Sequence, residues 1–361
     1  MSEKQHEVDD ILEEQHFQHV KDAFFFYHSS AQQQLDRRQK SYDSLPQNHK
    51  DLIPTLKARL SDTRRAIDEN YKLICNIIKS TNGMFSNSTI GNSNKKISYK
   101  PLSANDMSRV QTTLKQLVRD WSVEGKTERD QSYGLILNEI EELFPLTLFN
   151  RSNIFVVVPG AGLGRLMFDI ADRGFNCQGN EFSMYMLFAS NFMLNACHEV
   201  DSYHFYPWIH DTCNVFSNND QLRVVKIPDV CPSIQGRDLN FSMAAGDFLD
   251  VYNSDSKIDC CVMCFFIDTA HNPIIYINKV FEILKPGGYW INFGPLLYHF
   301  SDTIGEISVE LTYDELMNVI LSKFTLIKES VGLKAGYVQN CKSMMKTEYE
   351  CVFFVVQKPI C

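Results

Sequence analysis

The 361-residue sequence lacks an apolar run long enough to cross a membrane. Its longest apolar stretches, such as 260–267 and 351–356, are far shorter than the roughly 20 residues that a spanning helix needs. The first residues are polar and acidic, unlike a secretory signal peptide. We therefore expect a cytoplasmic protein without a membrane partner, and a nuclear pool is compatible with the sequence.

Paired cysteines and an excess of positive charge are also lacking. The eleven cysteines are odd in number and show no paired spacing, so we expect free thiols in a reduced compartment. Cys261 and Cys264 look like a metal or redox pair. They lie in an apolar run that predicts a strand, where residues three apart point to opposite faces, so no metal site is expected. The net charge of −9 argues against a broad nucleic-acid surface.

The rest of the chain is organised around residues 154–181, which read IFVVVPGAGLGRLMFDIADRGFNCQGNE. The β-branched start predicts a buried strand, and apolar residues at helical spacing predict a helix that starts within the glycine loop. A second short strand then ends at Glu181. Strand, glycine turn, helix, strand and terminal acid are typical of the first half of a nucleotide-binding α/β fold.

The spacing of the glycines limits which class of cofactor the loop can bind. Gly160, Gly162 and Gly164 form G-x-G-x-G, whereas the dinucleotide fingerprint G-x-G-x-x-G needs a glycine where this chain has Arg165. This argues against a nicotinamide-dependent oxidoreductase, and a plain turn or packing role is the other alternative. The motif instead resembles the cofactor loop of class I S-adenosylmethionine-dependent methyltransferases. The resemblance implies that the glycine turn backs onto the amino-acid part of the cofactor and that Glu181 binds the ribose hydroxyls.

The remaining elements fit such a fold. We predict an α/β, Rossmann-like class I methyltransferase sheet with an antiparallel C-terminal hairpin, preceded by an all-helical N-terminal region. Residues 1–100 are assigned to a helical cover or interaction region that ends in an Asn/Ser-rich loop, and 101–361 to the methyltransferase domain with a helical lid. The predicted helices are two or three within 1–80, then 106–121, 128–144, 184–197, 273–284 and one after 312; the predicted strands downstream are 259–267, 289–293, 324–331 and 349–356, and 203–240 is irregular.

The methyltransferase resemblance implies further cofactor contacts. At Asp247 the acid accepts a hydrogen bond from the adenine amino group, and the ring of Phe248 packs on the base. Gln116 and Arg119 share a face of the lid helix, where the arginine can hold the cofactor carboxylate with a two-pronged hydrogen bond. An ordinary surface ion pair is the alternative for these two residues. Cys264 is placed against the cofactor by its position near the end of the fourth strand.

Longer sequence strings resemble one particular family of methyltransferases. PGAGLGRL, QGNEFS, YPWIHD, AGDF, CFFIDTAHN, LKPGGYWINFGPLLYH and MMK-x-x-YECVFFVV together resemble the carnosine N-methyltransferase family, over roughly residues 110–360. That family transfers the methyl group of S-adenosylmethionine to an imidazole nitrogen of carnosine (β-alanyl-histidine), giving anserine, and accepts related histidine peptides. The resemblance therefore implies a small histidine-containing peptide as the substrate.

Three residues are predicted to hold that peptide. Methyl transfer is an in-line displacement, so the enzyme mainly positions the nucleophile. A carboxylate that accepts the N–H of a neutral imidazole fixes its tautomer and stabilises the developing cation. Asp268, placed at the end of the fourth strand, is our choice for this catalytic role, and a helix cap is its alternative. By resemblance His299, at the end of the fifth strand, and Tyr349 contact the peptide; a loop histidine and a sheet residue are the plain alternatives.

Some alternatives remain open from the sequence. Thr347 stands where relatives carry a run of tyrosines, which bears on substrate preference more than on activity. Methylation of histidine within larger peptides or proteins is one alternative function. A non-enzymatic protein that binds S-adenosylmethionine is another, with the helical N-terminal region serving a partner. The same region is a candidate interface for a homodimer.

Overall fold

The computed structural model describes residues 3–82, 84, 101–232, 239–255 and 257–360. The chain forms two compact units. The first, called the helical unit, contains residues 1–124, 184–233 and 339–346; the second, called the sheet unit, contains 125–183, 234–338 and 347–361. The units are interleaved in sequence and do not follow the predicted boundary at residue 100. Most of the predicted loop at 81–99 lies outside the described residues.

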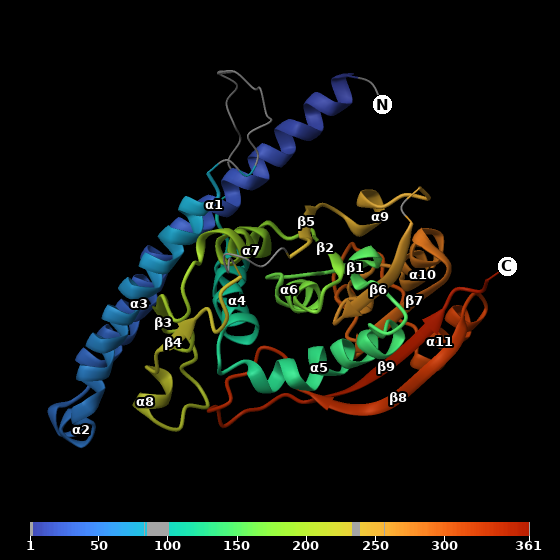
Figure 1. The fold of residues 1–361 in the computed structure, drawn as a ribbon. Coiled ribbons are helices and arrows are strands. Elements are labelled where there is room, and N and C mark those ends of the chain that lie inside the picture. Colours follow the sequence, from blue (N-terminus) through green and yellow to red (C-terminus); the bar gives the residue numbers. More distant parts are fainter. Residues whose placement is uncertain (1–2, 83, 85–100, 233–238, 256, 361) are drawn as a thin grey trace. The chain divides into compact units, whose positions relative to one another are not determined.

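The helical unit is built mainly from helices, several of them long (Figure 1). Its helices are α1 (Glu3–Asp43), α2 (Gln47–Leu52), α3 (Pro54–Ser80), α4 (Ala104–Trp121), α7 (Met184–Ala196) and α8 (Asn218–Gln221). Helix α1 packs on α3 and α4, and α3 packs on α7. This confirms the predicted helices within residues 1–80 and the helix that ends at Trp121. None of the described helices combines the length and apolar character that crossing a bilayer requires.

The carboxylate of Asp106 connects three of these helices, α4, α7 and α1. Ser103 caps α4 and forms a capping box with Asp106. Asp106 also accepts a hydrogen bond from Tyr185 of α7 at 2.9 Å and contacts Nε2 of His19 of α1 at 3.2 Å. Burial acts to raise the pKa of Asp106, but these hydrogen bonds outweigh it and lower the pKa. The start of α4 is therefore fixed to both neighbours.

The region predicted to be irregular, 203–240, contains a small antiparallel sheet of β3 (Tyr203–Phe205) and β4 (Val225–Ile227). Asn70 of α3 accepts the backbone N–H of Tyr206 at 2.7 Å and donates to its carbonyl at 2.9 Å. The hydroxyl of Tyr27 lies 2.8 Å from Nε2 of His210. These bonds pin the YPWIHD string to the helices, which supports a structural role for its aromatic residues.

The sheet unit has a seven-stranded sheet in the order β5-β2-β1-β6-β7-β9-β8. The first five are parallel, and β9 runs antiparallel to β7 and β8. The strands are β1 (Phe155–Pro159), β2 (Asn176–Glu181), β5 (Phe241–Ala245), β6 (Ile258–Cys264), β7 (Leu284–Gly294), β8 (Thr325–Ala335) and β9 (Tyr349–Gln357). This confirms the predicted fold class, including the antiparallel C-terminal hairpin.

Helices cover both faces of the sheet (Figure 1). They are α5 (Lys126–Leu143), α6 (Arg165–Asp172), α9 (Phe248–Val251), α10 (Pro273–Ile283) and α11 (Tyr313–Leu321), with single 3₁₀ turns η1 (Arg151–Asn153) and η2 (Ile267–Thr269). Tyr289 and Trp290 are adjacent in β7 and so point to opposite faces. Tyr289 packs on Phe144 after α5, whereas Trp290 packs on Phe324 after α11. The core therefore has a layer on each side of β7.

Three strands differ from their predicted bounds by three residues or more, and one of them, β8, ends at Ala335, four residues later than predicted. Strand β6 ends at Cys264, three residues earlier than predicted, because Phe265 has φ +54° and turns the chain out of the ladder. Strand β7 begins at Leu284, five residues earlier than predicted. The Pro-Gly-Gly sequence forms the irregular start of the strand, where the register against β6 shifts between Ile258 and Cys260.

Candidate active site at the carboxyl edge of the sheet

The sheet unit brings most of the predicted site residues to one edge, which we call the carboxyl edge. Parallel strands end at the same edge, so the residues that come directly after β5, β2, β1, β6 and β7 lie along it. Strand β9 runs the other way, with Val352 opposite Gly294. Its first residue, Tyr349, therefore also lies at the carboxyl edge.

The glycine loop after β1 has a crowded side and an open side. Gly160 has φ +67°, and a Cβ there would lie 2.3 Å from the ring of Phe266. Gly162 has φ +56°, and a Cβ there would meet no heavy atom within 4 Å. The loop is also tied to β2, because the Ala161 N–H donates to the carbonyl of Asn180 at 2.9 Å. Gly160 thus permits close packing, and Gly162 faces free space.

Glu181 closes this loop from the end of β2. Its Oε2 accepts the N–H of Gly162 at 2.8 Å, and its Oε1 accepts those of Phe182 at 2.9 Å and Ser183 at 2.8 Å. Burial raises the pKa of Glu181, against the lowering effect of the three N–H groups. A carboxylate offers about four acceptor positions. One position therefore remains for a hydroxyl group.

Asp247 and Phe248 follow β5 at the same edge. The Asp247 side chain caps α9, accepting the N–H of Leu249 at 2.8 Å. Phe248 is 2% exposed, and its ring meets Phe266 at 90° and Tyr276 at 82°. The structure therefore places Phe248 in the core beside the glycine loop. Its contact with the adenine stays a prediction, as does that of Asp247.

Asp268 lies in η2 and not, as predicted, at the end of a strand. The turn at Phe265 moves it four residues past the end of β6, yet it remains at the carboxyl edge. Asp268 is 3% exposed, and its Oδ2 accepts the N–H of Leu297 at 2.8 Å. Its backbone carbonyl accepts the N–H of His299 at 3.1 Å. Asp268 therefore joins the segments that come after β6 and β7.

Burial is the largest electrostatic influence on Asp268. Burial raises its pKa, while the Leu297 N–H and the positive charge of a protonated His299 act in the opposite direction. His299 also needs a correction, because it lies five residues beyond the end of β7. It is exposed, in contrast to the buried Asp268. A buried carboxyl group beside an exposed imidazole is the main feature of this part of the edge.

An aromatic cluster lies where β9 begins. Tyr349 is half-buried, and its ring meets the edge of Phe265 with the centroids 6.2 Å apart. Tyr337 stacks at a tilt on the same Phe265, at 4.7 Å. Cys264 precedes Phe265 at the end of β6 and is half-buried. Thr347 is exposed, two residues before Tyr349. The structure thus brings Tyr349 and Cys264 to the same part of the edge.

Comparison with known proteins identifies the family. Residues 97–360 match the family described as "Carnosine N-methyltransferase". The chain is 46% identical over 355 residues to carnosine N-methyltransferase of Rattus norvegicus, covering 98% of this chain and 88% of the relative. The chain belongs to the carnosine N-methyltransferase family. Other relatives of that name include those of Drosophila melanogaster (38% identity; 98% and 81% covered) and Schizosaccharomyces pombe (38%; 93% and 94%).

Solved structures resemble this member of the family only distantly. One is an S-adenosylmethionine-dependent methyltransferase from Methanosarcina mazei, with 15% identity and a TM-score of 0.38, covering 60% of this chain and 99% of that one. Another is the N-methyltransferase NodS of Bradyrhizobium japonicum in complex with S-adenosyl-L-homocysteine, with 10% identity and a TM-score of 0.37, covering 68% and 98%.

This carnosine N-methyltransferase family member is an S-adenosylmethionine-dependent enzyme, and the residues at its carboxyl edge fit that methyl donor. Free space at Gly162 leaves room for a ligand beside the glycine loop. The remaining acceptor position of Glu181 suits a ribose hydroxyl. No group of three or more His, Cys, Asp or Glu side chains suited to a metal ion occurs in the described part of the chain.

Gln116 and Arg119 belong to the helical unit. Both lie in α4 and are buried, at 7% and 6% exposure, so the alternative of a surface ion pair is wrong. Arg119 donates to the carboxylate of Asp120 at 3.3 Å. Their contact with the methyl donor stays a prediction.

The sequence did not single out several residues that shape the edge. Asn180, buried at the end of β2, donates to the carbonyl of Gly246 at 2.9 Å and so connects β2 to the loop after β5. Phe265 and Tyr337 form the aromatic cluster with Tyr349. The adjacent phenylalanines of CFFID were the available signal, but the left-handed turn at Phe265 cannot be read from a strand-like composition.

Proposed function

We propose that this enzyme methylates an imidazole nitrogen of carnosine, giving anserine, and that related histidine dipeptides are further substrates. Family membership supports the proposal, because its relatives are named carnosine N-methyltransferase at 38–46% identity. The observation that carries it is the position of Asp268, a buried carboxyl group at the carboxyl edge beside the exposed His299. A proton-bearing heterocycle is the kind of substrate that such a carboxylate orients.

Asp268 acts on the nitrogen of the substrate that carries the proton. Its Oδ2 already accepts the Leu297 N–H, which fixes the side chain and leaves other lone pairs for the imidazole N–H. Accepting that N–H fixes the tautomer, so the lone pair of the other ring nitrogen is available for methylation. The carboxylate also stabilises the positive charge that develops on the ring. When bound, S-adenosylmethionine supplies a methyl group on a positively charged sulfur.

His299 and Tyr349 complete the proposed peptide site. The exposed imidazole of His299 suits the carboxylate or the imidazole of a dipeptide, since it can donate or accept a hydrogen bond. Tyr349 offers a ring and a hydroxyl at the start of β9. Thr347 departs from the run of tyrosines that the family resemblance implies, and this departure bears on which histidine peptide is preferred.

The residues proposed to hold the methyl donor lie mainly in the sheet unit. They come from the glycine loop, the acid after β2 and the ends of β5 and β6; these residues are Gly160, Gly162, Glu181, Asp247, Phe248 and Cys264. Gln116 and Arg119 of the helical unit are included on the basis of the family resemblance alone. The guanidinium suits the carboxylate of the methionine part.

A methyl-transfer assay tests the proposal. The purified protein is incubated with methyl-labelled S-adenosylmethionine and carnosine, beside homocarnosine and a protein extract. Label in the dipeptide, located on one imidazole nitrogen by NMR, is the expected result. Label found only in protein would indicate that the substrate is histidine within polypeptides. Tight binding of S-adenosylmethionine with no label anywhere indicates a non-enzymatic binding protein.

Two further proposals concern the molecule in the cell. We propose a homodimer formed through α1, which is supported by the exposed side chains of Leu12, Phe25 and Phe26 on that helix. Sedimentation at several concentrations tests it, with Phe26→Ser expected to shift the protein toward monomer. We also propose a cytoplasmic location, with a nuclear pool, which imaging of the tagged protein tests.

A further inference from the structure

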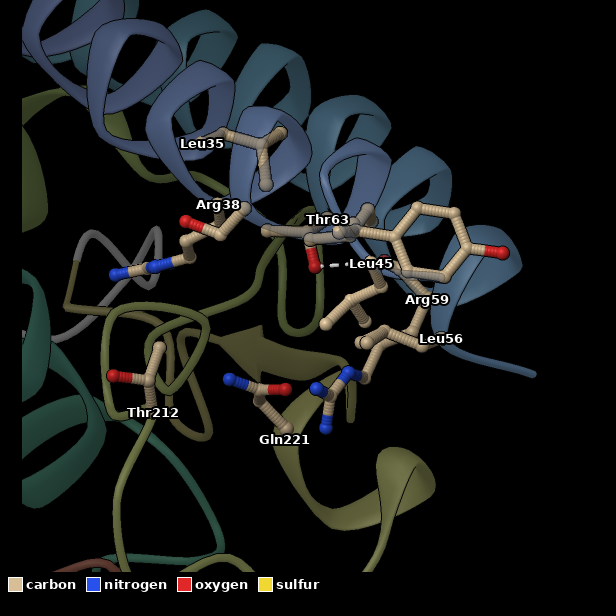
Figure 2. Close-up of a pocket in the computed structure, with 11 residues that line it drawn as sticks. Leu35, Arg38, Leu45, Leu56, Arg59, Thr63, Thr212 and Gln221 are labelled. Carbon is tan, nitrogen blue, oxygen red and sulfur yellow. Dashed lines mark hydrogen bonds between the residues drawn. The ribbon is translucent and has the colours of Figure 1, made fainter. Parts of the chain in front are cut away.

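The helical unit contains a cavity of about 320 Å³ between α1, α3 and the segment that includes α8 (Figure 2). All of its lining residues belong to this one unit. The volume lies at the lower end of the range of small-molecule sites, about 300–1,000 Å³. The walls are of two kinds. Four leucines form an apolar part, and two arginines with several hydroxyl and amide side chains form a polar part; the leucines are Leu35, Leu45, Leu56 and Leu60.

The two arginines are the charged side chains among the described residues that line the cavity. Arg38 comes from α1 and Arg59 from α3, and Figure 2 shows both side chains extending toward the segment with Thr212 and Gln221. No carboxylate lines the cavity within the described part of the chain. Arg59 donates to a neutral group, Oδ1 of Asn218, at 3.3 Å. Both guanidiniums thus face a cavity whose described lining offers them no acidic partner.

The electrostatics agree with this geometry. Burial lowers the pKa of Arg38, and the nearby positive charge of Arg59 lowers it further. A neighbouring arginine shows the usual arrangement, because Arg64 of α3 pairs with Asp36 of α1 at 2.7 Å and with Gln32 at 2.6 Å. The same two helices therefore neutralise a charge outside the cavity, whereas the two arginines inside it have no acidic partner among the described residues.

We propose that this cavity binds a phosphate monoester that carries a small apolar group. A guanidinium forms paired hydrogen bonds with phosphate oxygens, and a phosphate monoester has a charge between about −1.5 and −2 at neutral pH. That charge matches the summed charge of the two arginines, whereas the charge of a monocarboxylate matches half of it. The four leucines exclude water from the apolar group. The site is distinct from the carboxyl edge, since every lining residue lies in the helical unit.

Calorimetry with phenyl phosphate tests the proposal on the full chain saturated with S-adenosyl-L-homocysteine, so that the site of the methyl donor is occupied. Saturable binding is expected, with inorganic phosphate and benzoate each binding at least about tenfold more weakly. Arg38→Gln and Arg59→Gln should each weaken binding of phenyl phosphate about tenfold or more, since each removes a charged hydrogen bond. Arg37→Gln is the matched control, because Arg37 is the exposed neighbour of Arg38 on α1. It should bind phenyl phosphate like the parent protein.

Thermal unfolding separates a binding role from a structural one. Arg38→Gln should unfold at or above the temperature of the parent in the absence of phenyl phosphate, because it removes a repulsive, partly buried charge. The stabilisation that the parent gains from phenyl phosphate should be lost in the same variant. The proposal is overturned if phenyl phosphate does not bind, or if succinate, a dicarboxylate, binds more tightly than phenyl phosphate. It is also overturned if Arg37→Gln weakens binding of phenyl phosphate as much as Arg38→Gln does.

Discussion

At the scale of single residues, the carboxyl edge depends on two carboxylates that folding removes from water. Glu181 is held by three backbone N–H groups, and Asp268 by one N–H from the segment after β7. Burial raises the pKa of both. Carboxyl groups kept in such surroundings cost stability, which is typical of groups retained for binding or catalysis.

Replacing Asp268 by asparagine should separate catalysis from donor binding. Asp268→Asn is expected to lower kcat by about 10²-fold or more, because the amide does not stabilise the cation that develops on the imidazole. Affinity for S-adenosylmethionine should stay within a few-fold, and Asp268→Ala should abolish turnover with the same small effect on affinity. Kinetics and calorimetry on both variants check this. Loss of donor binding would assign Asp268 to the donor site instead.

The same variant gives a prediction about pH. The folded pKa of Asp268 is raised, so its contribution to stability is fully present below the unfolded pKa, about 3.9, and is lost as the pH rises through the folded value. Relative to Asp268→Asn, the parent should therefore become less stable as the pH rises above about 4. Urea unfolding of both proteins across this range measures the difference. A difference that grows in favour of the parent with rising pH would contradict the assignment.

Glu181 should matter for the donor and little for the chemical step. Glu181→Gln puts an NH₂ group where the carboxylate accepts backbone N–H groups, so at least one of the three hydrogen bonds is lost. We expect the Kd for S-adenosylmethionine to rise about tenfold or more. Glu282→Gln, at a glutamate of α10, is the control and should leave the Kd unchanged. Equal effects of the two replacements would remove Glu181 from the donor site.

At the scale of elements, the loops after the strands determine the site more than the strands do. The left-handed turn at Phe265 ends β6 and begins the segment that carries Asp268. The neighbouring Phe266 fills the space beside Gly160. The glycine loop and the loop after β6 are therefore built against each other.

The two glycines of the loop should respond differently to substitution. Gly160→Ala adds both backbone strain and a clash with Phe266, and should lower the free energy of unfolding by about 2–4 kcal/mol. Gly162→Ala adds the strain alone, about 1 kcal/mol. Chemical denaturation of both variants measures this. A larger loss at Gly162 would mean that the crowded and open sides of the loop are wrongly assigned.

At the scale of the whole molecule, the helical unit is assembled from three separate stretches of the chain. Phe188 of α7 is fully buried, with its ring 5.0 Å from that of Phe17 and 6.0 Å from that of Phe24, both on α1. Residues inserted after β2 thus complete a core that begins in α1. The helical N-terminal region is therefore not a removable cover.

A truncation tests this architecture. Residues 101–361 alone should aggregate or unfold, because removal of α1 and α3 exposes the apolar face of α7, including Phe188. The matched control is the full chain with Asp36→Asn, which affects only an exposed ion pair with Arg64. Size exclusion and limited proteolysis compare the two. A monodisperse, active fragment 101–361 would instead support the predicted domain boundary at residue 100.

Much of the fold was predictable because its signals are local in the chain. Strand composition, glycine spacing and a strand-end acid indicated the first half of the sheet, and the periodicity of apolar residues located the long helices. The family resemblance added the antiparallel hairpin and the site residues. The predicted end of β6 and the predicted start of β7 were wrong, because a left-handed turn and an irregular strand start depend on packing between distant segments.

The sequence by itself determined the class of fold, the methyl donor and the family, since these depend on motifs of a few adjacent residues. Only the tertiary structure decided that residues 184–233 complete the helical unit and that Asp268 is held by Leu297. It alone showed that Arg38 and Arg59 share a cavity whose described lining has no acid. The physical reason is that burial and charge compensation depend on which distant segments meet, and composition or spacing does not contain that information.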